Sequence, residues 1–206
     1  MVFEDAGADA MSAAKWITFS PAAVTVDSGR NYSVRVTADV PKDAKPGVYR
    51  AGIFVQERPP ATPPQKGDHT ILFRFRYLEV LYIIVPPTAA DAKLVDASIE
   101  PAGNRLDLVC RMRNDGSGLV RPFLNWSLRD ESGSVVRQEK RLEANVLLPQ
   151  AKLSEHVPLG GLAPGKYELS IQVDFRDNKP VQALTRKVEI SDLPEAARPA
   201  SIGKQP

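Results

Sequence analysis

Pro46-Gly47-Val48-Tyr49-Arg50 in the first half of the chain has a counterpart in the second half, Pro164-Gly165-Lys166-Tyr167-Glu168, and an alternating apolar run follows each motif. A Pro-Gly pair favours a tight turn, because proline presets φ and glycine accepts a positive φ. The tyrosine two residues after the glycine is placed to anchor that turn. The repeated motif therefore predicts two β-sandwich domains in tandem.

Further residues of the second half resemble the immunoglobulin-like fold. In that fold a corner tyrosine packs its ring inward and bonds its hydroxyl group back to the backbone. Cys110 on the predicted second strand, Trp126 on the third and Tyr167 at the corner match this pattern, whereas Leu169 stands where the second cysteine of a disulfide would be. We therefore predict an all-β chain of two tandem immunoglobulin-like domains, with Cys110 as a small buried side chain rather than a reactive thiol.

The composition is that of an ordinary globular protein, long enough for two domains of about 100 residues. Of its 206 residues 43% are hydrophobic, and 27 basic residues nearly balance 25 acidic residues to give a formal charge of +2. The chain has no dense block of lysine and arginine, which argues against nucleic acid as a partner. No apolar run approaches the roughly 20 residues of a membrane-spanning helix, so membrane insertion is not expected.

The second domain, residues 88–192, is predicted to be a complete sandwich of about seven strands. These strands are expected at Ala92 to Ile99, Arg105 to Arg113, Phe123 to Arg129, Val135 to Arg141, Lys152 to Val157, Tyr167 to Phe175 and Gln182 to Ile190. A proline-containing elbow, Val85 to Asp91, precedes this domain. The tail, residues 193–206, has no periodic apolar face and is expected to be disordered.

The first domain, residues 1–87, supplies only about five candidate strands and is therefore expected to be incomplete at its N-terminus. They are Trp16 to Phe19, Val24 to Val26, Tyr32 to Ala38, Tyr49 to Gln56 and Ile71 to Val85. The absence of the opening strands would expose core residues and unpaired strand edges. Two explanations are open: the sequence is a shortened form of a longer chain, which we favour, or another chain donates the missing strand.

The segment best suited to a function is the long connection from Arg58 to His69 together with the strand that follows it. Hairpin connections usually have about two to five residues, so a longer one calls for a reason. After this connection, Ile71, Phe73, Phe75 and Tyr77 share one face of the predicted strand, opposite Arg74 and Arg76. Such a strand either fills the core of its own domain, which its alternation favours, or forms an edge that accepts an extended partner strand.

This layout resembles the periplasmic pilus-assembly chaperones, in which a proline elbow joins two immunoglobulin-like domains and a long loop leads into an extended last strand of the first domain. The stretch from Tyr77 to Pro86 is similar to their edge strand, which lends alternate apolar side chains to an incomplete pilin. In that family a lysine on this strand and an arginine near the N-terminus bind the terminal carboxylate of the pilin. Here Glu79 or Val80 stands at the lysine position and Val85 precedes the proline in place of an arginine.

The resemblance implies a non-enzymatic protein that acts in the periplasm or outside the cell, with its signal sequence upstream of this chain. Its partner would be a secreted or pilin-like subunit, bound by addition of a β-strand; a strand-swapped homo-oligomer is a further option. The alternative is a structural or adhesive module of a bacterial surface protein, because Trp16 to Pro21 and Val40 to Tyr49 resemble repeats of exported adhesins and glycosidases. The candidate partner-binding residues are Phe73, Arg74, Phe75, Arg76, Tyr77 and Leu78.

No catalytic motif or cofactor motif stands out in the sequence. His69 and His156 are its only histidines, and neither lies at a spacing typical of metal ligands. No serine lies in a Gly-x-Ser-x-Gly motif, and no glycine-rich segment has the pattern of a nucleotide-binding loop. We therefore expect no enzyme activity, no metal and no cofactor.

Overall fold

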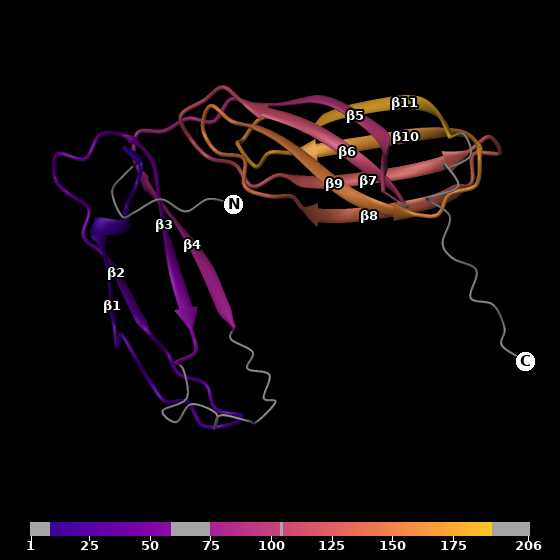
Figure 1. Cartoon of the computed structure of the whole chain (residues 1–206). Helices are drawn as coiled ribbons and strands as arrows, with labels where there is room; N and C mark the ends of the chain where they lie inside the picture. Colours follow the sequence, from indigo (N-terminus) through magenta and orange to yellow (C-terminus); the bar gives the residue numbers. More distant parts are fainter. Residues whose placement is uncertain (1–8, 59–74, 104, 191–206) are drawn as a thin grey trace, which may run out of the picture. The chain divides into compact units, whose positions relative to one another are not determined.

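The computed structural model describes residues 9–58, 75–103 and 105–190, and within them the chain is all-β (Figure 1). One short 3-10 helix, η1 (Ala14–Trp16), precedes the strands. The strands are β1 (Ile17–Ser20), β2 (Arg35–Ala38), β3 (Gly47–Gln56), β4 (Arg76–Val85), β5 (Ala92–Ala102), β6 (Arg105–Asn114), β7 (Phe123–Asp130), β8 (Val135–Glu143), β9 (Lys152–Gly160), β10 (Gly165–Asp174) and β11 (Gln182–Ile190). The chain divides into two compact units, unit 1 (Met1–Pro87) and unit 2 (Thr88–Pro206).

Unit 1 contains two antiparallel sheets, and the described residues give each of them two strands: β1 with β2, and β3 with β4. In the first sheet Ile17 pairs with Ala38 and Phe19 with Val36, so one face of this sheet is apolar. The residues between these pairs, such as Thr18 opposite Thr37, make the other face polar.

The buried core of unit 1 is small. Tyr49, Ala51 and Ala13 are buried, and Trp16 and Ile83 pack against them. The rings of Trp16 and Tyr49 lie 4.4 Å apart. Outside this cluster the apolar side chains are open to solvent, since thirteen of the sixteen exposed large apolar side chains of the described residues belong to unit 1. The strands of unit 1 therefore have more apolar surface than they bury.

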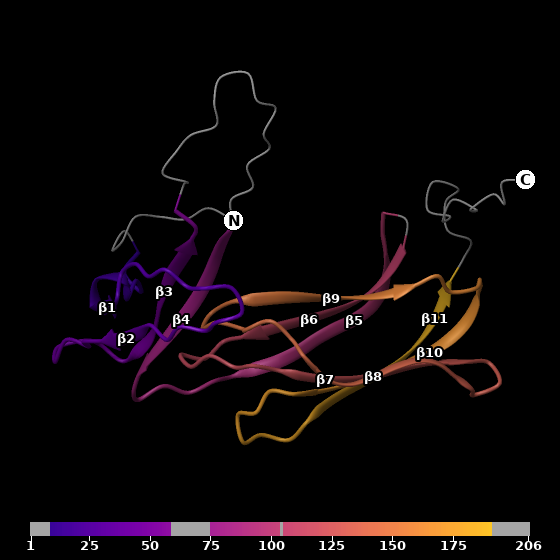
Figure 2. The same ribbon diagram turned by 90° about the horizontal axis from the view of Figure 1, so that it is seen from below.

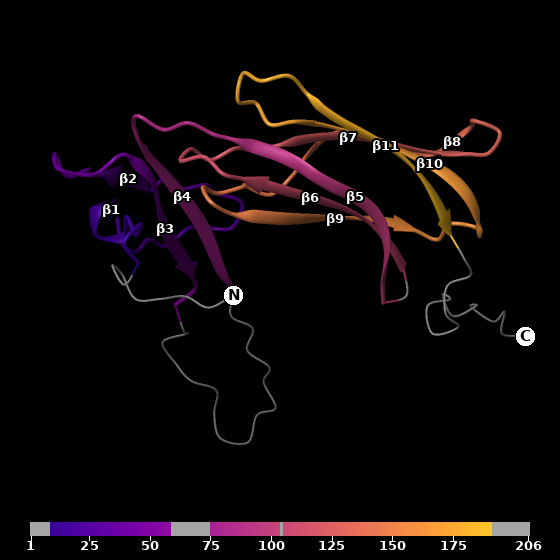
Figure 3. The same ribbon diagram turned by 90° about the horizontal axis from the view of Figure 1, so that it is seen from above.

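Unit 2 has two antiparallel sheets in an arrangement consistent with a β-sandwich. One sheet has the strand order β5-β6-β9 and the other β11-β10-β7-β8. Figure 2 and Figure 3 show these two sheets as separate layers. A single core cluster takes side chains from both sheets, including Leu108 and Met112 of β6, Leu124 of β7 and Ile171 of β10. Cys110 and Trp126 belong to the same cluster, so the burial predicted for Cys110 is confirmed.

Both repeated tyrosines make the backbone hydrogen bond predicted from the sequence. The hydroxyl group of Tyr49 donates to the carbonyl oxygen of Lys45 at 2.9 Å, and that of Tyr167 donates to the carbonyl oxygen of Ala163 at 2.8 Å. In each case the acceptor lies four residues earlier, so the hydrogen bond closes the Pro-Gly turn.

The strands predicted for the second half are all present, with ends that agree within three residues. In the first half, the strand predicted from Tyr32 begins only at Arg35, and the one predicted at Val24 to Val26 is wrong. Val24 and Val26 are 43% and 47% exposed, so no neighbouring strand covers them. β4 begins at Arg76, and the earlier part of its predicted run, from Ile71 to Arg74, lies outside the described residues, as does the tail predicted to be disordered.

Candidate functional site

The sheet of β3 and β4 is the longest regular feature of unit 1. The two strands pair from Gly47 with Val85 to Gln56 with Arg76, and the register does not shift over the ten pairs. Neither strand contains a proline, and no third strand joins them within the described residues. Bulges and prolines are the usual means of bending or blocking a strand edge, so both outer edges of this sheet are regular and unprotected.

Hydrogen bonds at Arg50 establish which backbone groups point to these edges. The N–H group of Arg50 donates to the carbonyl oxygen of Met11 at 2.9 Å, and its carbonyl oxygen accepts from the N–H group of Ala13 at 2.8 Å. Both groups of Arg50 therefore point away from β4, and alternate residues of the ladder repeat this orientation. On β4 the groups that point to the outer edge include those of Leu78, Val80 and Ile84.

Phe75 and Tyr77 lie together on one face of the sheet, as the sequence predicts. Their rings are stacked at 6.4 Å with an interplanar angle of 18°. They are 54% and 66% exposed, however, so the interpretation of these two rings as core residues is wrong. Phe73 and Arg74, the other two candidates before Arg76, lie outside the described residues.

Arg76 and Leu78 lie on the opposite face of β4 from Phe75 and Tyr77. The guanidinium group of Arg76 stacks over the ring of Phe54 at 3.6 Å, a cation–π contact between the two strands. Leu78 pairs with Phe54 in the same ladder and is half-buried. The structure thus corrects the grouping of Leu78 with the two exposed rings, because side chains alternate between the faces of a strand.

Two residues that the sequence analysis did not select extend the apolar row that begins at Leu78. Val80 is 40% exposed and Ile84 is 52% exposed, both on the same face of β4. The available signal was the run from Leu78 to Ile84, which is apolar at every position except Glu79. A strand that is apolar on both faces is typical of a strand covered on both sides.

The outer strands of unit 2 are protected, in contrast to β3 and β4. β5 has a register shift after Leu94 and carries Pro101, and β9 carries Pro158. β8 has two register shifts against β7, and β11 carries alternating charges such as Lys187 and Glu189. Natural sheets use these devices against pairing with other chains, so the edges open to strand addition lie in unit 1.

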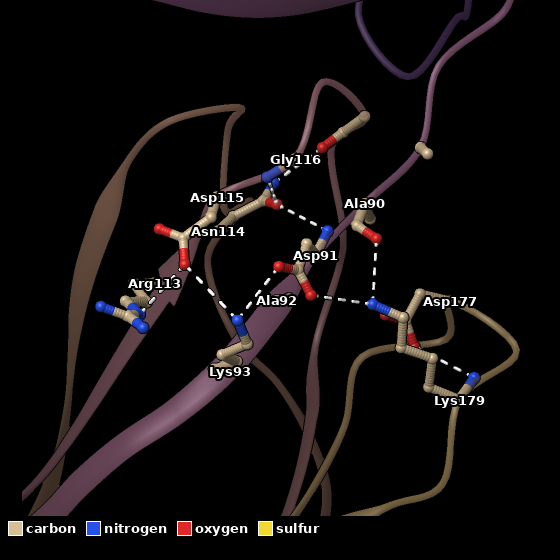
Figure 4. Close-up of polar contacts among 12 residues, drawn as sticks. Ala90, Asp91, Ala92, Lys93, Arg113, Asn114, Asp115, Gly116, Asp177 and Lys179 are labelled. Atoms are coloured by element: carbon tan, nitrogen blue, oxygen red, sulfur yellow. Dashed lines mark hydrogen bonds and ion pairs between the residues drawn. The ribbon is translucent and has the colours of Figure 1, made fainter.

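A polar cluster in unit 2 centres on the buried side chain of Asn114 (Figure 4). Its Oδ1 atom accepts hydrogen bonds from the N–H groups of Asp91 at 3.1 Å and Gly116 at 3.0 Å. Its Nδ2 atom donates to the carbonyl oxygens of Gly118 at 2.7 Å and Leu148 at 3.2 Å. One side chain therefore joins the beginning of unit 2 to two loops.

Lys179 adds the hairpin between β10 and β11 to this polar cluster. Its Nζ atom donates to Oδ1 of Asp91 at 3.0 Å and to the carbonyl oxygen of Ala90 at 3.2 Å, and lies 3.7 Å from Oδ2 of Asp177. The hydrogen bonds of Asp91 with Lys179, and then with Lys93, hold the pKa of that carboxyl below its usual range. These charges are paired within the chain, so we assign the cluster a structural role.

The described residues contain no group of three or more histidine, cysteine or acidic side chains placed to hold a metal ion. His156 lies beside the buried carboxylate of Asp107, with 3.6 Å between Nδ1 and Oδ2, whereas His69 lies outside the described residues. Burial, followed by the charges of Glu155 and Asp96, raises the pKa of the Cys110 thiol to about 12, so this thiol is unreactive at neutral pH.

Comparison with known proteins yields no match, either to a protein-family model or to a curated protein. None of the helices in the described residues is long and apolar enough to cross a membrane. The functional argument therefore rests on the strand edges of unit 1.

Proposed function

We propose that the chain is a non-enzymatic exported protein, built of two immunoglobulin-like domains and related to the pilus-assembly chaperones, that binds a secreted subunit by β-strand addition. The observation that carries this proposal is the outer edge of β4. It is regular over ten residues, has no proline, and carries the exposed apolar side chains Val80 and Ile84. The binding strand would add to this edge.

The immunoglobulin-like part of the proposal is supported by the strand order of unit 2. The first, second and fifth of its strands form one sheet, and the third, fourth, sixth and seventh form the other. This separation is that of an immunoglobulin-like sandwich, in which hairpins alternate between two sheets. Cys110 and Trp126 lie in the core, and Tyr167 makes the corner hydrogen bond typical of that fold.

The mechanism follows from the chemistry of the β4 edge. A partner strand would pair with the backbone groups of Leu78, Val80 and Ile84, and each hydrogen bond of this kind contributes about 0.5–1.5 kcal/mol net. Burial of a valine or isoleucine side chain adds up to about 1.5–3 kcal/mol when it is complete. Backbone pairing would supply affinity, and the apolar row would supply the register.

The decisive experiment compares proline variants of the two edges. Val80→Pro removes an N–H group that points away from β3, so it blocks the β4 edge and leaves the β3 and β4 ladder intact. Gln56→Pro, which removes an outward N–H group of β3, is the matched control. Tagged protein from the envelope of the source cell should retain a stoichiometric β-rich subunit as wild type and as Gln56→Pro, but not as Val80→Pro.

A protein that is recovered alone, folded and monomeric, would contradict subunit binding. That result would favour the second candidate, a structural or adhesive module of a surface protein. The polar cluster around Asn114 favours this candidate, because it fixes the first residues of unit 2 to two loops, as a module within a longer array requires.

A further inference from the structure

We propose that unit 1 has a second strand-accepting edge, the outer edge of β3, and that its ligand is an extended segment of another polypeptide. This segment would be apolar on one side and polar or acidic on the other. The site lies on the opposite edge of the sheet from the β4 edge, so the inference is independent of the proposed function.

The outer edge of β3 is only partly occupied by the chain itself. Residues 11–13 run parallel to β3 and bond to it at a single position, Arg50. The chain then turns away in η1, which begins at Ala14. By the alternation set at Arg50, the backbone groups of Gly52 and Gln56 point to the same edge, beyond the reach of this short pairing. A strand-shaped complement is required there, because only an extended backbone matches the spacing of these groups.

The apolar side of the ligand is defined by the core-facing side of β3 and β4. Burial along this side ends abruptly: Tyr49 and Ala51 are each 7% exposed, whereas Val55 is 60% exposed and Tyr77, its partner on β4, is 66% exposed. The small core of unit 1 therefore covers one end of the side and leaves the other open. A strand added beside Gly52 and Gln56 would place alternate side chains next to Val55, and these must be large and apolar.

The other side of the ligand is defined by charge. On the opposite face of β3 and β4 the charged side chains are two arginines, Arg50 and Arg76, with no acidic residue on this face of either strand. Asp9, just before the segment that already pairs with this edge, makes an ion pair with Arg50. The same complementarity favours an acidic or polar side chain at alternate positions of the added strand.

A second copy of this chain fits the site less well. Pairing the β4 edge of one copy with the β3 edge of the next is a heterologous contact that does not close, so it would propagate into filaments. Pairing β3 with β3 around a two-fold axis leaves only the segment from Gly52 to Gln56, because residues 11–13 occupy the edge at Arg50. We therefore assign the site to a different polypeptide.

The test uses the full chain and a short synthetic peptide in which valine alternates with threonine and glutamate. Amide hydrogen exchange is followed residue by residue by NMR. At a peptide concentration of about ten times Kd, exchange at Gly52 and Gln56 should slow by about tenfold. Leu78, Val80 and Ile84 should not change. Gln56→Pro should abolish the effect, and Val80→Pro should preserve it.

Three results would overturn the inference. The first is protection at the β4 positions alone, which would leave the β4 proposal standing, and the second is no protection at either edge. The third is concentration-dependent filament formation without peptide, which would identify a second copy as the occupant. Loss of the β4 partner in the co-purification experiment would leave this inference untouched, since the two proline variants separate the edges.

Discussion

Asn114 is the residue on which the order of the loops at one end of unit 2 depends most. Its side chain is buried and satisfies two backbone N–H groups and two backbone carbonyl groups from separate segments. A buried polar group that loses its partner costs about 1–3 kcal/mol. The four contacts therefore represent a large share of the stability of a single domain.

Asn114→Ala is expected to lower the free energy of unfolding of unit 2 by about 3 kcal/mol or more, because several backbone groups lose their partner at once. Urea denaturation followed by the fluorescence of Trp126 measures this loss. Asn145→Ala, whose side chain is exposed, is the control and should cost less than about 0.5 kcal/mol. Equal midpoints for the two variants would contradict the structural role of Asn114.

Asp91 predicts a pH dependence with a definite sign. Its pKa is lowered, first by the hydrogen bond from Lys179, so the contact stabilises the folded state above the unfolded pKa and is lost as pH falls through the folded pKa. Stability should therefore decline below about pH 4, near the ordinary aspartate value. Urea midpoints as a function of pH should fall less steeply for Lys179→Met than for wild type. Parallel curves would contradict the contact.

At the scale of residues, the sequence predicts roles that depend on local chain geometry. The hydrogen bonds of Tyr49 and Tyr167 reach only four residues back, so the Pro-Gly-x-Tyr motif is sufficient to predict them. The role of Asn114 was missed, because two of its acceptors and donors lie 23 and 34 residues away. Only the fold brings those backbone groups to one side chain.

At the scale of elements, unit 1 and unit 2 treat their strand edges differently. The edges of unit 2 carry prolines, register shifts and charges, whereas β3 and β4 are regular and end in exposed apolar side chains. A domain that needs no partner at its edges gains by blocking them. The lack of such protection is the main reason for assigning binding to unit 1.

The exposed pair Phe75 and Tyr77 provides a test at this scale. Phe75→Ser combined with Tyr77→Ser should change the free energy of unfolding by less than about 1 kcal/mol, because neither ring is buried. Tyr49→Ser, at a buried ring, should cost about 3–5 kcal/mol and is the control. Thermal unfolding separates the two cases, and a large loss in the double variant would restore the core interpretation.

Alternation of apolar residues predicted the strands of unit 2 well, because each of them has two neighbouring layers to satisfy. It could not predict the exposure of Phe75 and Tyr77, since burial of a strand face depends on which other strands cover it. The same reason explains the error at Val24 to Val26, where the apolar pattern is present but no strand pairs with it. The faces of β4 could be predicted, but not which of them lies open.

At the scale of the whole molecule, the two units differ in how much they bury. Twenty of the twenty-four buried apolar side chains of the described residues belong to unit 2. Stability follows buried apolar area, so the two units are expected to unfold separately rather than as one cooperative structure.

The two tryptophans make this expectation testable, since Trp16 lies in unit 1 and Trp126 in unit 2. Trp16→Phe leaves a fluorescent reporter for unit 2 alone, and Trp126→Phe leaves one for unit 1. In urea, the transition reported by Trp16 should occur at a lower concentration than the one reported by Trp126. Coincident transitions would mean that the units unfold as one.

The burial of Cys110 has a practical consequence for work on this chain. It is the only cysteine, it is fully buried, and its thiol has a pKa of about 12. Maleimide reagents attack the thiolate, which at neutral pH is a fraction of about one in 100,000 for such a group. A cysteine introduced at an exposed position such as Val55 or Val135 can therefore be labelled with a dye or spin probe in an otherwise unchanged background.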